Sequence, residues 1–333
     1  MGRILNKLIE TERLNNFKLN IRLLLNSKYK KSFCKVKRQF REINDTQKNE
    51  LYAYLSDFYF STYDCDCYSY LNTEIGKKDM NDHMFDRLID FRRFVIPWLN
   101  SIVSLPQCKI LEIGCGTGCT TVALAEQDCE LSSIDVDSTH IKVAQKRCEI
   151  YDLSVNIHAI NATCINEINE KFDMIIFSAS LEHMTYEERL TSIKLAWNMI
   201  KKNGFLVVIE TPNRLHYFDG HSSILPFYHW LPDEIAIQYS KFSPREACKN
   251  SSSDEMAFIR FGRGASFHEF ELALGKKCAD MTIYDMQSFL DIFISKVIHR
   301  NKREYSKLLK KIGPAGVPDG FYHSDLYIAI EKS

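Results

Sequence analysis

Short apolar runs alternate with amphipathic stretches through the middle of the chain. We predict strands at 108–115, 130–137, 155–162, 172–180 and 204–212, with a last strand at 324–332. Between them, apolar side chains recur every three or four residues, which predicts helices at 119–127, 138–152 and 186–204, the second capped by Ser138 and the third closed by Gly204. Short apolar strands separated by helices are typical of a parallel sheet buried on both faces. The predicted architecture is a doubly wound α/β fold.

The region before this alternation is predicted to be helical. Apolar spacing indicates a long helix over 4–43 and a second one over 82–96, which Pro97 is expected to end or kink. Between them, the stretch 51–71 is dense in Tyr and Phe and is expected to pack as a helical cap, since aromatic rings cover a large area. We therefore assign residues 1–100 to an N-terminal helical extension and cap.

After the fifth predicted strand the regular alternation lapses for some fifty residues. This stretch is rich in His, Pro and aromatic side chains, and we predict that it forms a lid insertion at about 213–270. A long helix at 286–312 then leads to the last strand. Residues 101–333 are thus predicted to be one α/β domain with a lid.

Composition narrows the class of protein. The chain has 333 residues, 45% of them hydrophobic, and no run of about 18 apolar residues that would span a bilayer. Its 43 basic and 43 acidic side chains cancel, yet residues 1–50 hold 13 basic against 5 acidic ones. This arm is expected to contact anionic membranes weakly through residues 1–45, or to be a solvated amphipathic helix. The rest of the chain is net acidic, so nucleic-acid binding is not expected.

Cysteine usage indicates a reducing compartment. The count of 11 is odd, and no secretory signal peptide is recognisable at the start, so we expect free thiols and a cytoplasmic location, with peripheral contact to the inner membrane face as an alternative. Cys65 and Cys67 have no second matching pair, and we predict no metal site.

The chemistry-bearing motif follows the first predicted strand, where Glu112, Gly114, Gly116 and Gly118 lead directly into a helix. Glycines at this spacing let the backbone turn tightly and let a ligand approach closely. A dinucleotide fingerprint would place its third glycine or an alanine at position 119, which is Cys119. The preceding acid would repel a pyrophosphate and attract an ammonium group. The motif therefore favours a ligand that carries an amino-acid group.

Polar residues at the ends of the next strands extend this pattern. Asp135 ends the second strand and is placed to accept bonds from ribose hydroxyl groups. Asn161 and Ala162 end the third strand, where the Asn side-chain carbonyl would receive an adenine amino group, and Ser178 ends the fourth. Each of these residues also has an ordinary interpretation as a turn or cap residue.

In these motifs the chain resembles the class I S-adenosylmethionine-dependent methyltransferases, over roughly 108–212. LEIGCGTG (Leu111 to Gly118) is similar to the first family motif, SSIDVD to the second, and FDMIIFSASLEHM with GFLVVIETPNR to the fourth and fifth strands. The L-E-H turn and T-P-N strand end are most similar to the quinone-biosynthesis O-methyltransferases. Three flanking segments, FRRFVIPWL, the stretch from TPNR to HWLP, and RGASFHEFELA, resemble methyltransferases associated with bacterial surface polysaccharides.

The resemblance implies a Rossmann-like, mainly parallel seven-stranded sheet and S-adenosyl-L-methionine as cofactor. Glu112 and the glycine loop would hold the methionine end, Asp135 the ribose, and Asn161 with Ala162 the adenine. The cofactor-binding residues we expect are Glu112, Gly114, Cys115, Gly116, Gly118, Asp135, Val136, Asn161, Ala162 and Ser178.

Methyl transfer to a hydroxyl group also needs a proton acceptor, and histidine suits this role near neutral pH. His183 follows Glu182 after the fourth strand and is the first candidate base, with Glu182 orienting it or contacting substrate. His221, His229, His268 and Glu269 lie in the predicted lid and are alternatives for the base or for holding a divalent ion. We take His183, Glu182, His229 and His268 as the candidate catalytic residues.

The sequence therefore predicts an S-adenosylmethionine-dependent methyltransferase. O-methylation of a glycan, a lipid-linked sugar or another small hydroxylated acceptor is our first hypothesis. A quinone or phenolic O-methyltransferase and a non-catalytic cofactor-binding partner protein are the alternatives.

Overall fold

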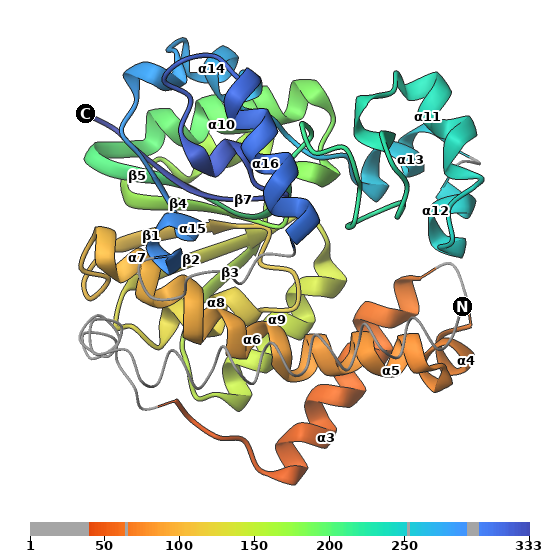
Figure 1. Ribbon diagram of the computed structural model, residues 1–333. Helices are drawn as coiled ribbons and strands as arrows, with labels where there is room; N and C mark the ends of the chain where they lie inside the picture. The colour runs from red at the N-terminus through yellow and green to blue at the C-terminus, as the bar shows by residue number, and fades with distance from the viewer. Residues whose placement is uncertain (1–39, 64–65, 252–253, 292–299) are drawn as a thin grey trace.

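A computed structural model of the protein describes residues 40–63, 66–251, 254–291 and 300–333 (Figure 1). Nearly all of the helix predicted over 4–43, most of the basic arm, and Cys65 lie outside the described residues. So does the middle of the helix predicted over 286–312, whose described ends are α15 (Met286–Asp291) and α16 (Arg300–Ile312).

A seven-stranded sheet forms the centre of the molecule, in the order β3-β2-β1-β4-β5-β7-β6. Five adjacent strands run parallel: β3, β2, β1, β4 and β5. Strand β7 pairs antiparallel with both β5 and β6. The strands are β1 (Lys109–Ile113), β2 (Glu130–Asp135), β3 (Asn156–Ala159), β4 (Phe172–Ser178), β5 (Ile200–Pro212), β6 (Ile283–Asp285) and β7 (Asp325–Glu331). The predicted fold class is confirmed. β6 has only three residues, too few to produce a recognisable apolar pattern.

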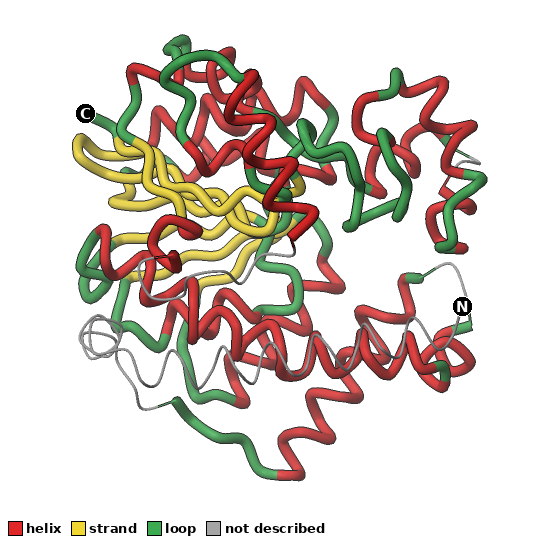
Figure 2. The backbone as a smooth tube through the Cα atoms, in the orientation of Figure 1, coloured by secondary structure: helices red, strands yellow, loops and turns green. Residues whose placement is uncertain are grey.

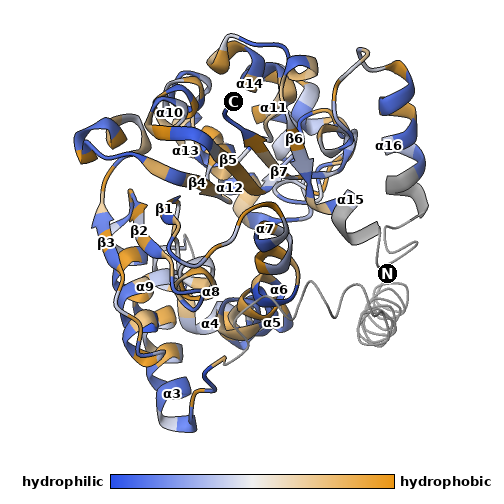
Figure 3. Ribbon diagram, turned by 90° about the vertical axis from the view of Figure 1, so that its left-hand side faces the viewer, coloured by the Kyte–Doolittle hydropathy of each residue, from blue (hydrophilic) through white to orange (hydrophobic). Residues whose placement is uncertain are grey.

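Helices cover both faces of this sheet, so that the strands lie between two helical layers (Figures 1 and 2). Side chains alternate along each strand: Ile110, Met174 and Val207 belong to one buried cluster, and their neighbours Leu111 and Ile175 to the other. In Figure 3 the hydrophobic colour follows β4, β5 and β7. Burial on both faces explains why the middle parts of these strands are apolar on both sides.

The helices that link the strands are α8 (Cys119–Ala125), α9 (Ser138–Ile150) and α10 (Tyr186–Met199). Two predicted caps are wrong. The N-cap of α9 is Asp137, whose carboxylate accepts bonds from the next turn, one residue before the predicted Ser138. Gly204 does not close α10, which ends at Met199; it lies inside β5, where an added Cβ would come within 2.7 Å of the Asp173 carbonyl oxygen.

The N-terminal extension runs from α3 (Asp45–Tyr54) through α4 (Cys67–Asn72) to a nearly continuous helical stretch, Glu74–Ile102. That stretch contains α5 (Glu74–Asn81), α6 (Arg87–Asp90) and α7 (Ile96–Ile102), separated by two π-helical turns. Pro97 does not end the helix. It lies directly after the π-helical turn Phe91–Val95, and the helix continues through it to Ile102. The extension shares one buried cluster with the sheet.

The predicted lid contains α11 (Asp233–Ser240), α12 (Glu246–Ser251), α13 (Glu255–Phe261) and α14 (Phe267–Leu274). In Figure 1 the first three of these helices form a group beside the sheet. They surround a small buried cluster of their own: Leu225, Tyr228, Ala236, Cys248 and Phe258. In the part of the chain that the structure describes, no helix is both long and apolar enough to cross a membrane.

Candidate functional site

The glycine loop between β1 and α8 is built on three residues with positive φ. Gly114 (φ 84°) and Gly118 (φ 82°) lie close to neighbouring segments, since an added Cβ would come within 2.9 Å of the Ser178 carbonyl oxygen and 2.9 Å of the Ala144 Cα. Gly116 (φ 48°) would have nothing within 4 Å of an added Cβ. Two of the glycines are thus required by packing, and the third opens onto space that a ligand can fill.

Asp135 lies at the end of β2 beside this loop. Its Oδ2 accepts a hydrogen bond from the Gly116 N–H at 2.8 Å, and its Oδ1 accepts one from the Asp137 N–H at 2.9 Å. The next residue, Val136, is 73% exposed. The structure therefore brings the predicted ribose acid and the open glycine together, across 19 residues of sequence.

Glu112 lies beneath the loop, in the protein interior. It is 0% exposed, and its Oε2 accepts bonds from the Thr121 and Ser133 hydroxyl groups, both at 2.7 Å. Among the described residues its Oε1 has no hydrogen-bond partner. Burial raises the pKa of this carboxyl to about 7, against the lowering effect of the two hydroxyl bonds. The predicted contact with the methionine ammonium stays a prediction.

The remaining predicted cofactor residues make contacts within the protein. Asn161 Oδ1 accepts bonds from the Thr163 N–H and hydroxyl, both at 2.9 Å, so its two lone pairs are already used in capping a turn. An adenine amino group would therefore have to displace one of these bonds. Ala162 and Cys115 are buried, and Ser178 Oγ lies 2.9 Å from Thr120 Oγ1.

Two residues that the sequence did not single out connect the N-terminal extension to the glycine loop. Arg147 of α9 is 0% exposed and donates to the carbonyl oxygen atoms of Thr117, in the loop, and His83, in the extension, both at 2.6 Å. His83 Nδ1 lies 3.2 Å from the Thr117 hydroxyl. The only sequence signal for Arg147 was a charged residue on the apolar side of a helix.

The turn after β4 holds a buried carboxylate between two histidines. Glu182 is 0% exposed, and its Oε2 accepts a bond from the Thr211 hydroxyl at 3.1 Å. Its Oε1 lies 4.0 Å from Nε2 of the adjacent His183 and 3.9 Å from Nε2 of His221, which comes from the lid. Within the described ranges, this Oε1 has no hydrogen-bond partner. His183, His221 and Glu182 thus form one cluster, and we call its two histidines, His183 and His221, the histidine pair.

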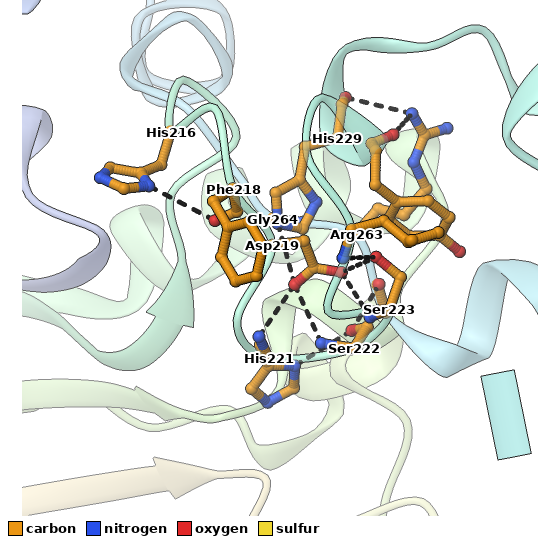
Figure 4. A network of polar contacts seen from close by, with 12 residues as sticks. His216, Phe218, Asp219, His221, Ser222, Ser223, His229, Arg263 and Gly264 are labelled. Atoms are coloured by element: carbon orange, nitrogen blue, oxygen red, sulfur yellow. Dashed lines mark hydrogen bonds and ion pairs between the residues drawn. The ribbon is translucent and has the colours of Figure 1, made fainter. Parts of the chain in front are cut away.

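The lid segment that carries His221 is organised around Asp219 (Figure 4). Oδ1 of Asp219 accepts the N–H bonds of His221 and Ser222, both at 2.9 Å, and Oδ2 accepts the N–H of Ser223 at 2.6 Å. Burial alone would raise the pKa of Asp219, but the bonds from His229 and these N–H groups hold it well below its usual range.

His229 is only 2% exposed and belongs to this Asp219 network. Its Nδ1 accepts the Gly264 N–H at 3.3 Å, so its Nε2 carries the proton and faces Asp219 Oδ1 at 3.3 Å. In this arrangement neither ring nitrogen of His229 has a lone pair to spare, and its predicted catalytic role stays a prediction.

His268 lies at the start of α14. Its ring stacks on Phe267, with centroids 3.9 Å apart, and its Nδ1 lies 3.4 Å from the Ser266 hydroxyl. Its predicted catalytic role stays a prediction. Nearby, Glu269 pairs with the buried Arg189 at 2.7 Å, so that this lid acid serves the attachment of α14 to α10. The described residues contain no group of three or more His, Cys, Asp or Glu side chains that would hold a metal ion.

Comparison with known proteins matches the central part of the chain. A family model described as a methyltransferase domain matches residues 110–204. A ubiquinone biosynthesis O-methyltransferase from Pseudomonas entomophila is 29% identical over 131 residues, which cover 39% of this chain and 55% of the relative. One from Bartonella tribocorum is 30% identical over 162 residues, 48% of this chain and 64% of the relative. The chain thus spans little more than half the length of the first relative.

Solved structures of methyltransferases also match, at low similarity. The magnesium protoporphyrin IX methyltransferase of Synechocystis, with bound S-adenosylhomocysteine, is 15% identical with a TM-score of 0.43, covering 72% of this chain and 90% of its own. Residues 110–204 thus match a methyltransferase domain, and the strand order and the glycine loop with Asp135 agree with the class I methyltransferase resemblance predicted from the sequence.

Proposed function

We propose that the protein transfers the methyl group of S-adenosylmethionine to a hydroxyl group of a glycan, a lipid-linked sugar or another small hydroxylated acceptor. The observation that carries this proposal is the convergence of three features. The open glycine loop follows β1, Asp135 ends the adjacent β2, and the Glu182 turn follows β4 on the other side of β1. Ligands of open α/β sheets bind at this carboxyl edge of the strands.

Methyl transfer mainly requires the protein to hold the two substrates in the right positions. A sulfonium methyl is already activated, so the site must align the acceptor oxygen, the methyl carbon and the sulfur, and exclude other orientations. The acceptor hydroxyl also loses a proton, and the histidine pair lies at the edge where the cofactor would bind. Residues of the loop after β1, of β2, of the turn after β4 and of the lid, which carries His221, would serve these two needs.

A titration by calorimetry with S-adenosylmethionine tests the cofactor part of the proposal. We expect binding by the wild type and at least about a tenfold loss in Asp135→Ala, the size expected when a hydrogen-bonded carboxylate is removed. Asp152→Ala is a matched control, because Asp152 is a largely exposed acid after the end of α9. No binding by the wild type, or equal binding by Asp135→Ala, would contradict the assignment.

The acceptor class is the less constrained part of the proposal. The sequence matches to ubiquinone biosynthesis O-methyltransferases support a quinone or phenolic acceptor as the second candidate. Extracts of a strain that lacks the gene distinguish the two: an under-methylated polysaccharide or lipid-linked sugar supports the first, and a missing quinone supports the second. Unchanged extracts, with cofactor binding intact, would favour a non-catalytic partner protein.

A cytoplasmic location and weak contact of the basic arm with anionic membranes complete the proposal. The net charge of residues 1–50 supports it, because a basic segment near an anionic surface gains about 1 kcal/mol per Lys or Arg. Co-sedimentation with phosphatidylserine vesicles should fall after deletion of residues 1–45 and at high salt. Equal sedimentation by the truncated chain would contradict the proposed membrane contact of residues 1–45.

A further inference from the structure

We propose that His183 and His221 act as a pair to accept the proton of the acceptor hydroxyl, with the buried carboxylate of Glu182 stabilising the imidazolium that forms. This inference rests on the proposed function and names the groups that would carry out its proton transfer. It assigns His221, a lid residue, to the same site as the turn after β4.

The tautomer of each histidine follows from its hydrogen bonds. His183 Nδ1 lies 2.7 Å from the Arg260 carbonyl oxygen, which can only accept, so Nδ1 carries the proton. His221 Nδ1 lies 3.1 Å from Ser222 Oγ, whose own hydrogen is directed to the Gly262 carbonyl oxygen at 2.8 Å. His221 therefore also carries its proton on Nδ1. In both neutral rings Nε2 keeps a lone pair, which is what a base requires.

Glu182 explains why both lone pairs lie near one place. Its unpartnered Oε1 is 4.0 Å from Nε2 of His183 and 3.9 Å from Nε2 of His221. A buried carboxylate is costly without a nearby positive charge, and an imidazolium at either histidine would supply that charge at 3.9 to 4.0 Å. Because the imidazolium of one histidine repels a charge on the other, the pair is suited to hold a single proton.

The lid holds His221 in this position through bonds that do not involve its ring. Asp219 accepts the His221 N–H, Arg245 donates to the His221 carbonyl, and the Ser222 hydroxyl joins the segment to Gly262. The neighbouring Arg263 N–H donates to the Glu182 carbonyl at 3.1 Å. The base is thus complete only when the lid lies against the turn after β4.

The site is also within reach of the cofactor loop. An added Cβ on Gly114 would touch Ser180, and Ser180 Oγ donates to the Ile113 carbonyl at 3.2 Å. Glu182 is two residues farther along the chain, and two residues span at most about 7 Å between Cα atoms. The transfer then balances. The acceptor oxygen bonds to the methyl carbon, the carbon–sulfur pair stays on sulfur, and the hydroxyl proton passes to one Nε2.

Charged and titratable groups around the pair set its response to pH. His221 is faced by Glu182, His183, Asp219 and Asp325, and Arg245 contacts its backbone. His183 is faced by Glu182, and the Arg260 guanidinium donates to its carbonyl. Burial lowers the pKa of His221, Glu182 acts to raise it and His183 lowers it further. His221 is therefore neutral, and able to accept a proton, at physiological pH.

Nitrogen-15 NMR of the full chain tests the arrangement without an acceptor. We expect Nδ1–H tautomers for His183 and His221, and a fall of about one unit in the pKa of His221 in Glu182→Gln, because the stabilising charge is gone. His183→Asn should raise the pKa of His221. His158→Asn, which replaces an exposed histidine of β3, is the control that should change neither. An Nε2–H tautomer at either histidine, or an unchanged His221 titration in Glu182→Gln, would overturn the proposal.

Methyl incorporation from labelled S-adenosylmethionine into an extract of a strain lacking the gene tests the function of the pair. We expect His183→Asn/His221→Asn to lose about 100-fold or more in rate, the usual contribution of a general base, and added imidazole to restore part of it in His221→Ala. The cofactor should still bind each variant. Full activity of the double variant would overturn the pair, and a larger loss in His268→Asn would place the base on α14. No incorporation by a wild type that binds the cofactor would instead contradict the proposed function.

Discussion

The glycine loop and the lid both hold polar groups in place, but they do so by different means. The loop uses backbone conformation: three glycines with positive φ lie within five residues and lead into a short helix. The lid uses side chains: Asp219 gathers successive N–H groups and His229. Local sequence specifies the loop. The N–H bonds to Asp219 are local too, but the bond of His229 to Gly264 and the position of His221 beside Glu182 depend on residues far apart in the chain. The two regions should therefore fail differently when altered.

The largest effect is expected in the loop, at Gly118. An alanine there must adopt φ 82° and place its Cβ 2.9 Å from the Ala144 backbone, which we expect to cost about 3 to 5 kcal/mol in the free energy of unfolding. Urea unfolding followed by circular dichroism measures this. Gly116→Ala is the matched control. It meets no atom and should cost about 1 kcal/mol while still weakening cofactor binding. Equal costs for the two would show that packing does not distinguish these glycines.

The lid should respond locally to the loss of Asp219. Asp219→Ala leaves buried N–H groups and His229 without their acceptor, and we expect about 3 to 4 kcal/mol of destabilisation confined to the lid. Hydrogen exchange should show faster exchange in α11 to α13 and little change in β1 and β4. Global unfolding at the same cost would mean that the lid and the sheet form one cooperative unit, despite the separate buried cluster of the lid.

Glu112 makes the stability of the sheet region depend on pH. Its pKa is raised from 4.5 to about 7, so the folded state binds more protons than the unfolded state between these values, and stability falls as pH rises through them. The full effect is about 3 kcal/mol at pH 8 relative to pH 4. The difference in unfolding free energy between the wild type and Glu112→Gln should change by this amount over the range. A constant difference would show that the pKa is not raised.

The smallest effect is expected at the exposed connection between the lid and α10. Arg260 of α13 pairs with Glu188 at 2.5 Å, and both side chains are partly exposed to solvent. Arg260→Met should cost less than about 1 kcal/mol in the free energy of unfolding, because exposed ion pairs are weak. Its backbone carbonyl, which accepts from His183, remains. A loss larger than that of Asp219→Ala would make this ion pair, and not the Asp219 network, the main attachment of the lid.

Much of the fold was predictable because its signals are local. Apolar runs of strand length identified six strands, and the spacing of Gly114, Gly116 and Gly118 identified the loop. Details that depend on the close approach of residues distant in sequence were not predictable. Gly204 resembles a helix C-cap in sequence but is required by the neighbouring Asp173 carbonyl, and Pro97 lies inside a helical stretch, directly after a π-helical turn.

The residues of the candidate site also fall into those that the sequence indicates and those that only the tertiary structure brings together. From the sequence alone, Glu112 and Asp135 were recognisable as acids at strand ends, and His183 as a histidine after the fourth strand. Only the tertiary structure decided that Glu112 is buried, that His229 has both ring nitrogens occupied, and that His221 joins Glu182 and His183. The physical reason is that periodicity and glycine spacing act over a few residues. The partner of a buried polar atom is determined by how distant segments pack.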